Sequence, residues 1–267
     1  MTTRPVVLTF SGHDPTGGAG MQADIEALSA HGCHAVGIIT ALTEQDTVNV
    51  KKLVPQSPQA IIDQAETLLN DLSVQAFKIG LLGHPSTASA IHSIVRQYPD
   101  VPVVFDPVLA AGGGTELASD DLIAAIQDCL LPCTTVLTPN SLEVRKLAGL
   151  ADLNDCAAKL LAKGCDYVLI TGTHEASAEV SNRLYHQNRC IQTLAWPRLP
   201  GSYHGSGCTL AAAIAGMIAR GLQPESAIAH AQRYTWQTLK AGYRLGKGQL
   251  IPDRFFAAPL GESFVDG

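Results

Sequence analysis

The sequence predicts an α/β protein built as a three-layer sandwich, with a mostly parallel central sheet and helices on both faces. Short β-branched runs alternate with helical patterns along the chain, which is typical of parallel strands joined by helical crossovers. The predicted strands are nearly continuous apolar runs, as expected of strands buried on both faces. The chain has 267 residues, 46% of them hydrophobic, so it can bury a large core. We expect a single domain over residues 1–267, because no linker, repeat or low-complexity tract interrupts the pattern.

The elements follow one another from the N-terminus. Strands are expected at 6–10, 35–42, 48–54, 76–80, 101–105, 135–138 and 167–171, and residues 178–196 resemble a small antiparallel hairpin. Helices are expected at 21–31, 58–72, 86–98, 120–130, 156–163, 207–220 and 224–245. Gly32 ends the first helix, because glycine readily takes the left-handed conformation that follows a helix. Ile25 and Leu28 are expected to share one face of that helix.

Bulk composition excludes several classes of protein. The net charge is −6 and there is no basic run, which argues against a nucleic-acid partner. No apolar stretch is long enough to span a membrane, and the first residues lack the pattern of a secretory signal. Seven cysteines stand at scattered spacings without a C-x-x-C pair, so neither a disulfide framework nor a zinc site is indicated. We expect a reduced, cytoplasmic protein.

The polar residues of interest follow the predicted strands. In open α/β sheets, ligands bind beyond the carboxyl ends of the strands, so the loops at those ends are the candidate site. They span residues 12–20, 43–47, 80–83, 106–114, 139–143 and 171–174. Their agreement in position favours one binding site along one rim of the sheet.

One segment combines a glycine turn with the start of an Ala-rich helix: His204-Gly205-Ser206-Gly207-Cys208. The first amides of a helix have no partners inside it and carry partial positive charge, so they attract an anion. The same field lowers the pKa of a thiol, which would make Cys208 a thiolate. Such a nest suits phosphoryl transfer. The alternative is that Gly205 and Gly207 only shape a turn around a small buried cysteine.

Two carboxylates follow predicted strands. Asp106 precedes Pro107 and could bind Mg²⁺ through water or cap a turn. Asn140 could cap a helix whose capping box Glu143 closes. Glu143 could also serve Mg²⁺, which is usually held by one or two carboxylates together with waters and phosphates.

Three further features are ambiguous on their own. Asp24, inside the first helix, is either a solvated position or a site residue. The Gln45 amide could donate to and accept from a heteroaromatic ring, or simply be solvated. The loop 17–20 resembles a phosphate cradle without the Gly-Lys-Ser/Thr ending of a P-loop, and it also suits a flat ligand packed against bare backbone.

Taken in this order, the motifs resemble the ribokinase superfamily and, within it, the hydroxymethylpyrimidine/phosphomethylpyrimidine kinases of thiamin biosynthesis. The resemblance covers nearly the whole chain. Most superfamily kinases have Asp where Cys208 stands, and cysteine there is characteristic of this branch. The motifs are Gly12-x-Asp14, Gly17-Gly18-Ala19-Gly20-x-Gln22-Ala23-Asp24, Thr40-Ala41-Leu42-x-x-Gln45-x-Thr47, Lys78-Ile79-Gly80-x-Leu82, Asp106-Pro107-Val108, Thr138-Pro139-Asn140-x-x-Glu143, His204-Gly205-Ser206-Gly207-Cys208-Thr209 and Leu245-Gly246-Lys247-Gly248.

The resemblance implies a ribokinase-like, homodimeric enzyme. It would use ATP to phosphorylate 4-amino-5-hydroxymethyl-2-methylpyrimidine and then its monophosphate. Cys208 would be the general base, and the amides of Gly205, Ser206, Gly207 and Cys208 would stabilise the phosphoryl group. Asp106 and Glu143 would organise Mg²⁺. Asn140, Thr171 and Lys247 would face ATP, and the pyrimidine pocket would comprise Gly12, Asp24, Gln45 and Leu81.

Three departures from the family pattern remove cations that would face phosphates. Residues 171–174, 111–114 and 200–202 replace stretches that carry lysine in the family. Each charge-assisted contact of this kind contributes roughly 1.5–3 kcal/mol, so phosphate handling is weakened unless Lys247, Arg198 or a K⁺ ion compensates. Two other interpretations therefore stay open: a pyridoxal-type kinase of the same superfamily, and a pyrimidine-binding protein with weakened catalysis.

Overall fold

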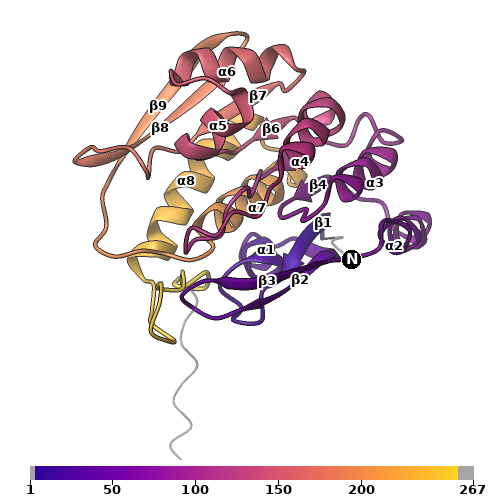
Figure 1. Ribbon diagram of the computed structural model, residues 1–267, viewed down its shortest axis with the longest axis horizontal. Coiled ribbons are helices and arrows are strands. Elements are labelled where there is room, and N and C mark those ends of the chain that lie inside the picture. Colours follow the sequence, from indigo (N-terminus) through magenta and orange to yellow (C-terminus); the bar gives the residue numbers. More distant parts are fainter. Residues whose placement is uncertain (1–3, 258–267) are drawn as a thin grey trace, which may run out of the picture.

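The computed structural model describes residues 4–257 (Figure 1). Within this range nine strands form one sheet in the order β3-β2-β1-β4-β5-β6-β7-β8-β9. Strands β2, β1, β4, β5, β6 and β7 run parallel, whereas β3, β8 and β9 are antiparallel to their neighbours. The strands are β1 Val6–His13, β2 His34–Gln45, β3 Val50–Pro55, β4 Ala76–Ile79, β5 Val103–Phe105, β6 Val136–Leu137, β7 Tyr167–Ile170, β8 Glu179–His186 and β9 Arg189–Pro197.

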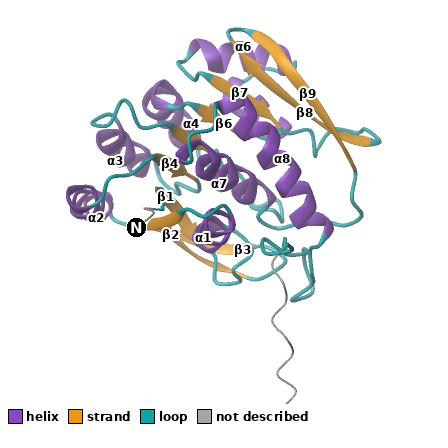
Figure 2. Ribbon diagram, turned by 180° about the vertical axis from the view of Figure 1, so that it is seen from behind, coloured by secondary structure: helices purple, strands orange, loops and turns teal. Residues whose placement is uncertain are grey.

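Helices cover both faces of this sheet, so the predicted three-layer arrangement is confirmed. One face packs against α2 Pro58–Asp71, α3 Pro85–Val95, α4 Asp120–Ala125, α5 Ser141–Ala148 and α6 Leu153–Ala162. The other packs against α1 Gly20–Ala30, α7 Ser206–Ala219 and α8 Pro224–Lys240, which lie in front in Figure 2. Alternate residues of the central strands point into the two cores. On β4, Phe77 and Ile79 face the first core, which turns Lys78 towards α1 and α7.

The predicted strands and the hairpin are present, but β1 extends to His13 and β2 to Gln45, into the expected loops 12–20 and 43–47. The other differences lie in the helices. The helix expected at 120–130 is α-helical only to Ala125 and continues as a π-helical segment, Ile126–Leu130. The last helix ends at Lys240 because the chain turns back at Gly242 and Tyr243 pairs with Ile251.

The prediction that Ile25 and Leu28 share one face of the first helix is confirmed only for the burial of Leu28. Leu28 is buried, but Ile25 is 45% exposed. Helix α1 instead turns small residues towards α7 and buries Ala27 and Asp24 beside Leu28. Gly32 follows the helix with a φ of +73°, as expected of a glycine just beyond a helix end. No helix among residues 4–257 has both the length and the apolar character needed to cross a bilayer.

Candidate active site

The loops at the carboxyl ends of the parallel strands meet the N-terminus of α7. Gly205 is the N-cap of this helix, with a φ of +77°. The amide of Thr209 donates to the Gly205 carbonyl at 2.9 Å, so the amides between them precede the helical hydrogen-bond ladder. A Cβ atom on Gly207 would lie 3.3 Å from an Asp106 carboxylate oxygen. The free amides of Ser206, Gly207 and Cys208 therefore begin next to Asp106.

The glycine at the N-cap is required twice over. A Cβ atom on Gly205 would lie 1.9 Å from the carbonyl oxygen of Gly18, and its left-handed backbone costs other residues about 1–2 kcal/mol. We expect Gly205→Ala to lower the free energy of unfolding by more than about 2 kcal/mol and turnover at least tenfold. Gly221→Ala is the control, because Gly221 has a φ of +92° and nothing within 4 Å of its Cβ position. If Gly205→Ala and Gly221→Ala lost equal unfolding free energy in urea melts and equal turnover, the steric argument would be contradicted.

Cys208 lies at the third position of α7 and is only 9% exposed. Burial raises the pKa of its thiol to about 12, and Lys78 only partly offsets this, since Asp106 and Asp24 raise it further. The prediction of a low-pKa thiolate is therefore wrong, because desolvation outweighs the field of the helix terminus. The Asp106 carboxylate and the Gly20 amide also act on this thiol, the carboxylate raising its pKa and the amide lowering it.

A buried ion pair lies beneath Cys208. The side chains of Lys78 and Asp24 have no exposed surface, and Lys78 Nζ lies 2.9 Å from Asp24 Oδ1. The ammonium also donates to Asp24 Oδ2 at 3.0 Å and to Ser11 Oγ at 3.2 Å. Burial by itself lowers the pKa of Lys78, but Asp24, Cys208 and Asp106 around it raise the value to about 12. The ammonium thus stays charged and counters the two carboxylates of the site.

Neither interpretation of Asp24, as a solvated helix position or as a residue that contacts a ligand, fits its surroundings. It is not a solvated helix position, and its carboxylate is bound by Lys78 and Ser11 rather than open to a ligand. Lys78 also belongs to the site, although no role for it was predicted from the sequence. The signal was a lysine within the otherwise apolar strand 76–80, because lysine is almost never fully buried unless it is paired.

Asp106 and Glu143 form the second part of the site. Burial raises the pKa of Asp106 to about 6. Burial, together with repulsion from Asp106, raises that of Glu143 to about 8. Asn140 accepts hydrogen bonds from the amides of Leu142 and Glu143, and Glu143 accepts one from the amide of Asn140 at 2.8 Å. The predicted capping box is therefore confirmed, and the two carboxylates also repel one another as a divalent-cation donor pair would.

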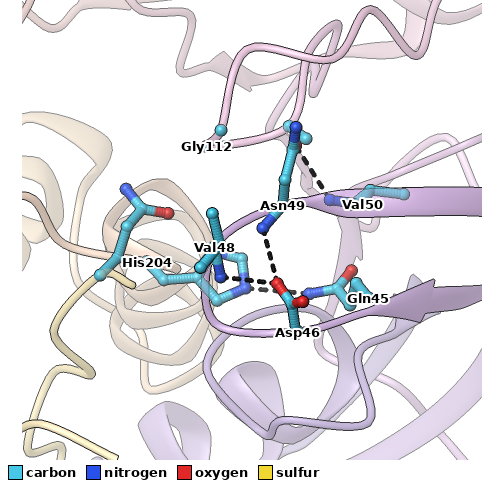
Figure 3. Close-up of a pocket in the computed structure, with 10 residues that line it drawn as sticks. Gln45, Asp46, Val48, Asn49, Val50, Gly112 and His204 are labelled. Carbon is cyan, nitrogen blue, oxygen red and sulfur yellow. Dashed lines mark hydrogen bonds between the residues drawn. The ribbon is translucent and has the colours of Figure 1, made fainter. Parts of the chain in front are cut away.

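A third part of the site surrounds Gln45 (Figure 3). His204 Nε2 lies 2.8 Å from Asp14 Oδ2 and 3.1 Å from Gln45 Nε2. The amides of Thr16 and Ala19 also donate to the Asp14 carboxylate. The sequence predicts no role for Asp14 or His204, because their pairing links residues 190 positions apart. The cavity here is about 10 Å³ and is lined by Gln45, Asp46, Val48, Asn49, Val50, Ala111, Gly112, Gly113, His204 and Gln249.

Glycines close this cavity. A Cβ atom would lie 2.4 Å from Gln249 Oε1 if placed on Gly112, and 2.5 Å from the Val48 carbonyl if placed on Gly113. The loop that lacks the family's lysine thus packs its backbone directly onto the connection between β2 and β3. Beside it, the predicted pair Gly12 and Leu81 are in contact, since a Cβ atom on Gly12 would lie 2.7 Å from Leu81 Cδ2.

Of the three residues expected to face ATP, Asn140 and Thr171 are adjacent, whereas Lys247 lies elsewhere. Asn140 and Thr171 form a bridge between the ends of β6 and β7. Lys247 is exposed, and its neighbours Gly246 and Gly248 pack against Thr47 beyond β2. Three strands, β1, β4 and β5, lie between β2 and β6 and so separate the two places along the sheet. The structure therefore places Lys247 on the side of Gln45.

Arg198 is not available to replace a missing cation. Its guanidinium donates to the carbonyl oxygens of Thr173, Glu175 and Ser177 at 2.9–3.1 Å. Of the three groups that could compensate for the missing lysines, Arg198 is thus committed to backbone carbonyls. This side chain instead holds the loop that follows β7.

Comparisons with known proteins agree with this geometry. Residues 14–253 match the family described as phosphomethylpyrimidine kinase. The hydroxymethylpyrimidine/phosphomethylpyrimidine kinase of Mycobacterium tuberculosis is 37% identical over 254 residues, covering 92% of each chain. Pyridoxal kinase from Staphylococcus aureus in complex with ADP superposes with a TM-score of 0.88 at 26% identity, covering 97% of this chain and 96% of that one. Phosphomethylpyrimidine kinase from Clostridium difficile superposes with a TM-score of 0.75 at 27% identity, covering 87% and 98%. The chain belongs to the phosphomethylpyrimidine kinase family.

Proposed function

We propose that this protein transfers the γ-phosphoryl group of ATP to the hydroxymethyl group of 4-amino-5-hydroxymethyl-2-methylpyrimidine, and then phosphorylates the monophosphate. The observation that carries the proposal is Cys208 in the first turn of α7, where the start of the helix lies against the Asp106 carboxylate. Free amides, a proton acceptor and a carboxylate pair at one point are what phosphoryl transfer requires. The family resemblance extends the proposal to a cytoplasmic homodimer.

In this mechanism Cys208 handles the substrate proton. The thiol first passes its proton to the Asp106 carboxylate, because a protonated sulfur cannot act as a base. The thiolate then takes the proton of the substrate hydroxyl as that oxygen attacks the γ-phosphorus and the bond to the ADP oxygen breaks. The amides of Ser206 and Gly207 stabilise the charge that spreads over the phosphoryl oxygens. Lys78 favours the thiolate by its buried charge.

Magnesium would be held by Asp106 and Glu143 together with waters and phosphate oxygens, and it would neutralise the charge of the phosphates. Asp106 has two oxygens, so one would take the proton of the thiol while the other would serve the metal. Asn140 and Thr171, which lie side by side, would border the nucleotide phosphates. Gln45 would bond the aminopyrimidine ring through both ends of its amide, with Leu81 and the backbone of Gly12 against the ring.

A pH dependence follows from the two carboxyl groups. Their folded-state pKa values, about 6 for Asp106 and about 8 for Glu143, lie above the ordinary values of 3.8 and 4.5. Each group therefore stabilises the fold below its unfolded pKa, and that contribution is lost as pH rises through the folded pKa. We expect the metal-free protein to lose thermal stability between about pH 4 and 8, the interval between the unfolded and folded pKa values, and Glu143→Gln to flatten that decline. Parallel profiles for the two proteins would contradict the assignment.

Magnesium binding should show the opposite trend. The ion favours ionised carboxylates, so its affinity in calorimetric titrations should rise between pH 6 and 8, with protons released on binding.

Pyridoxal phosphorylation is a second candidate function. It is favoured by the pyridoxal kinase of Staphylococcus aureus, whose complex with AMP-PCP and pyridoxal superposes with a TM-score of 0.87. Pyridoxal is also a heteroaromatic ring that carries a hydroxymethyl group, so the pocket does not distinguish the two by the reacting group alone.

Incubation of the pure protein with Mg-ATP and each ring separately tests both candidates, with ADP and phosphorylated products followed by mass spectrometry. Monophosphate followed by diphosphate supports the full proposal, and monophosphate alone removes the second step. Turnover of pyridoxal but not of the pyrimidine moves the assignment to the second candidate. Tight pyrimidine binding without ADP formation would instead favour a binding protein.

A further inference from the structure

Arg254 is fully buried just beyond the stretch that matches the family model, residues 14–253. Its guanidinium donates to Thr209 Oγ1 and to Glu26 Oε2, each at 2.9 Å, and to the carbonyl oxygen of Gly18. The Tyr234 hydroxyl donates to the backbone carbonyl of Arg254 at 2.8 Å and holds this part of the chain in place. The side chain thus joins the glycine loop, α1 and α7.

Two of these contacts lead to the N-cap of α7. The Thr209 hydroxyl, which accepts from Arg254, itself donates to the Gly205 carbonyl at 2.8 Å. The Gly18 carbonyl, the second acceptor, lies so close to Gly205 that a Cβ atom there would be 1.9 Å away. Arg254 therefore reaches the N-cap from two sides, and Gly205 is the residue from which the free amides of α7 start.

The choice of arginine fits this geometry. Burying a cation is costly even when it is paired, and well-packed apolar residues would hold the same elements together at least as well. A planar guanidinium offers several donors in fixed directions, so it can set the positions of Gly18 and Thr209 relative to each other. Glu26 supplies the compensating charge.

We propose that Arg254 is a positioning residue for phosphoryl transfer, acting on the α7 amides through Thr209 and Gly18. This inference rests on the proposed kinase function. Its consequence is a loss of kcat rather than of substrate binding, because the pyrimidine-side residues Gln45 and His204 make no contact with Arg254 among the hydrogen bonds of residues 4–257. A misplacement of about 1 Å at a catalytic group can lower a rate roughly 100-fold.

The test compares Arg254→Lys, Thr209→Val and Thr209→Ser with Arg220→Gln as the matched control. Arg220 donates to the His31 carbonyl at 3.3 Å and so joins α1 to α7 at the end far from the site. For each variant, kcat, the KM of the pyrimidine and the melting temperature are measured, with assays well below the melting temperature.

We expect Arg254→Lys and Thr209→Val to lower kcat about 10- to 100-fold and leave the KM of the pyrimidine within about threefold. Thr209→Ser keeps the hydroxyl and should recover most of the rate. Arg220→Gln should lower the melting temperature without changing kcat. If Arg254→Lys does not fold, the contrast between Thr209→Val and Thr209→Ser decides the matter.

Two results would overturn the inference. A folded Thr209→Val with the kcat of the unaltered protein would show that the contact is structural only, and so would an equal fall of kcat in Arg220→Gln. If the unaltered protein phosphorylates pyridoxal instead of the pyrimidine, the same comparison is made with pyridoxal. An unaltered protein that phosphorylates neither ring overturns the proposed function and the inference with it. An active unaltered protein whose Thr209→Val variant keeps its kcat overturns the inference alone, so the two failures are distinguishable.

Discussion

Replacing Cys208 with alanine is expected to abolish turnover while leaving the fold intact. General-base catalysis contributes about 10²- to 10⁴-fold to a rate, and this variant removes the sulfur that would take the substrate proton. The site is buried and the change removes a single atom, so the melting temperature should stay within a few degrees. ADP release and thermal melts measure the two effects.

Cys33→Ala is the matched control for this variant. Cys33 is also buried, and its thiol donates to the Gly216 carbonyl at 3.3 Å, near the other end of α7. It should cost similar stability and leave turnover unchanged. Normal turnover by Cys208→Ala would refute the base assignment, and the amides of α7 would then be the main catalytic feature.

Replacing Lys78 with methionine should cause the largest loss of stability of any single change in the site. Removing one partner of a buried ion pair costs about 3–5 kcal/mol, because the other charge remains buried without compensation. Here Asp24 would be left with Ser11 as its hydrogen-bond donor. For a chain of this size, that loss lowers the melting temperature by roughly 2–4 °C per kcal/mol.

The double variant Lys78→Met with Asp24→Asn distinguishes loss of a charge partner from loss of packing. It removes both charges, so most of the lost stability should return in urea unfolding. Lys163→Met is the surface control, since Lys163 pairs with Asp128 in solvent at 3.1 Å, and such pairs contribute about 0–1 kcal/mol. A double variant that is less stable than Lys78→Met alone would contradict the account.

Much of the fold follows from patterns that neighbouring residues carry. Apolar runs that alternate with helical spacing predict the parallel sheet and its helical layers, because both signals repeat within a few residues. The capping box at Asn140 is visible for the same reason. The position of the candidate site follows too, since the carboxyl ends of parallel strands meet at one edge. The family motifs add the roles that spacing alone does not supply.

What local patterns could not supply was the environment of each side chain. The acidity of Cys208 depends on how deeply α7 is buried, and there desolvation outweighs the helix field. Asp24 meets Lys78 from 54 positions away, and Gly18 meets Arg254 from 236 positions away. Such contacts arise when strands and helices pack, so burial and long-range pairing, rather than sequence spacing, determine which polar residues face a ligand and which hold the site in place.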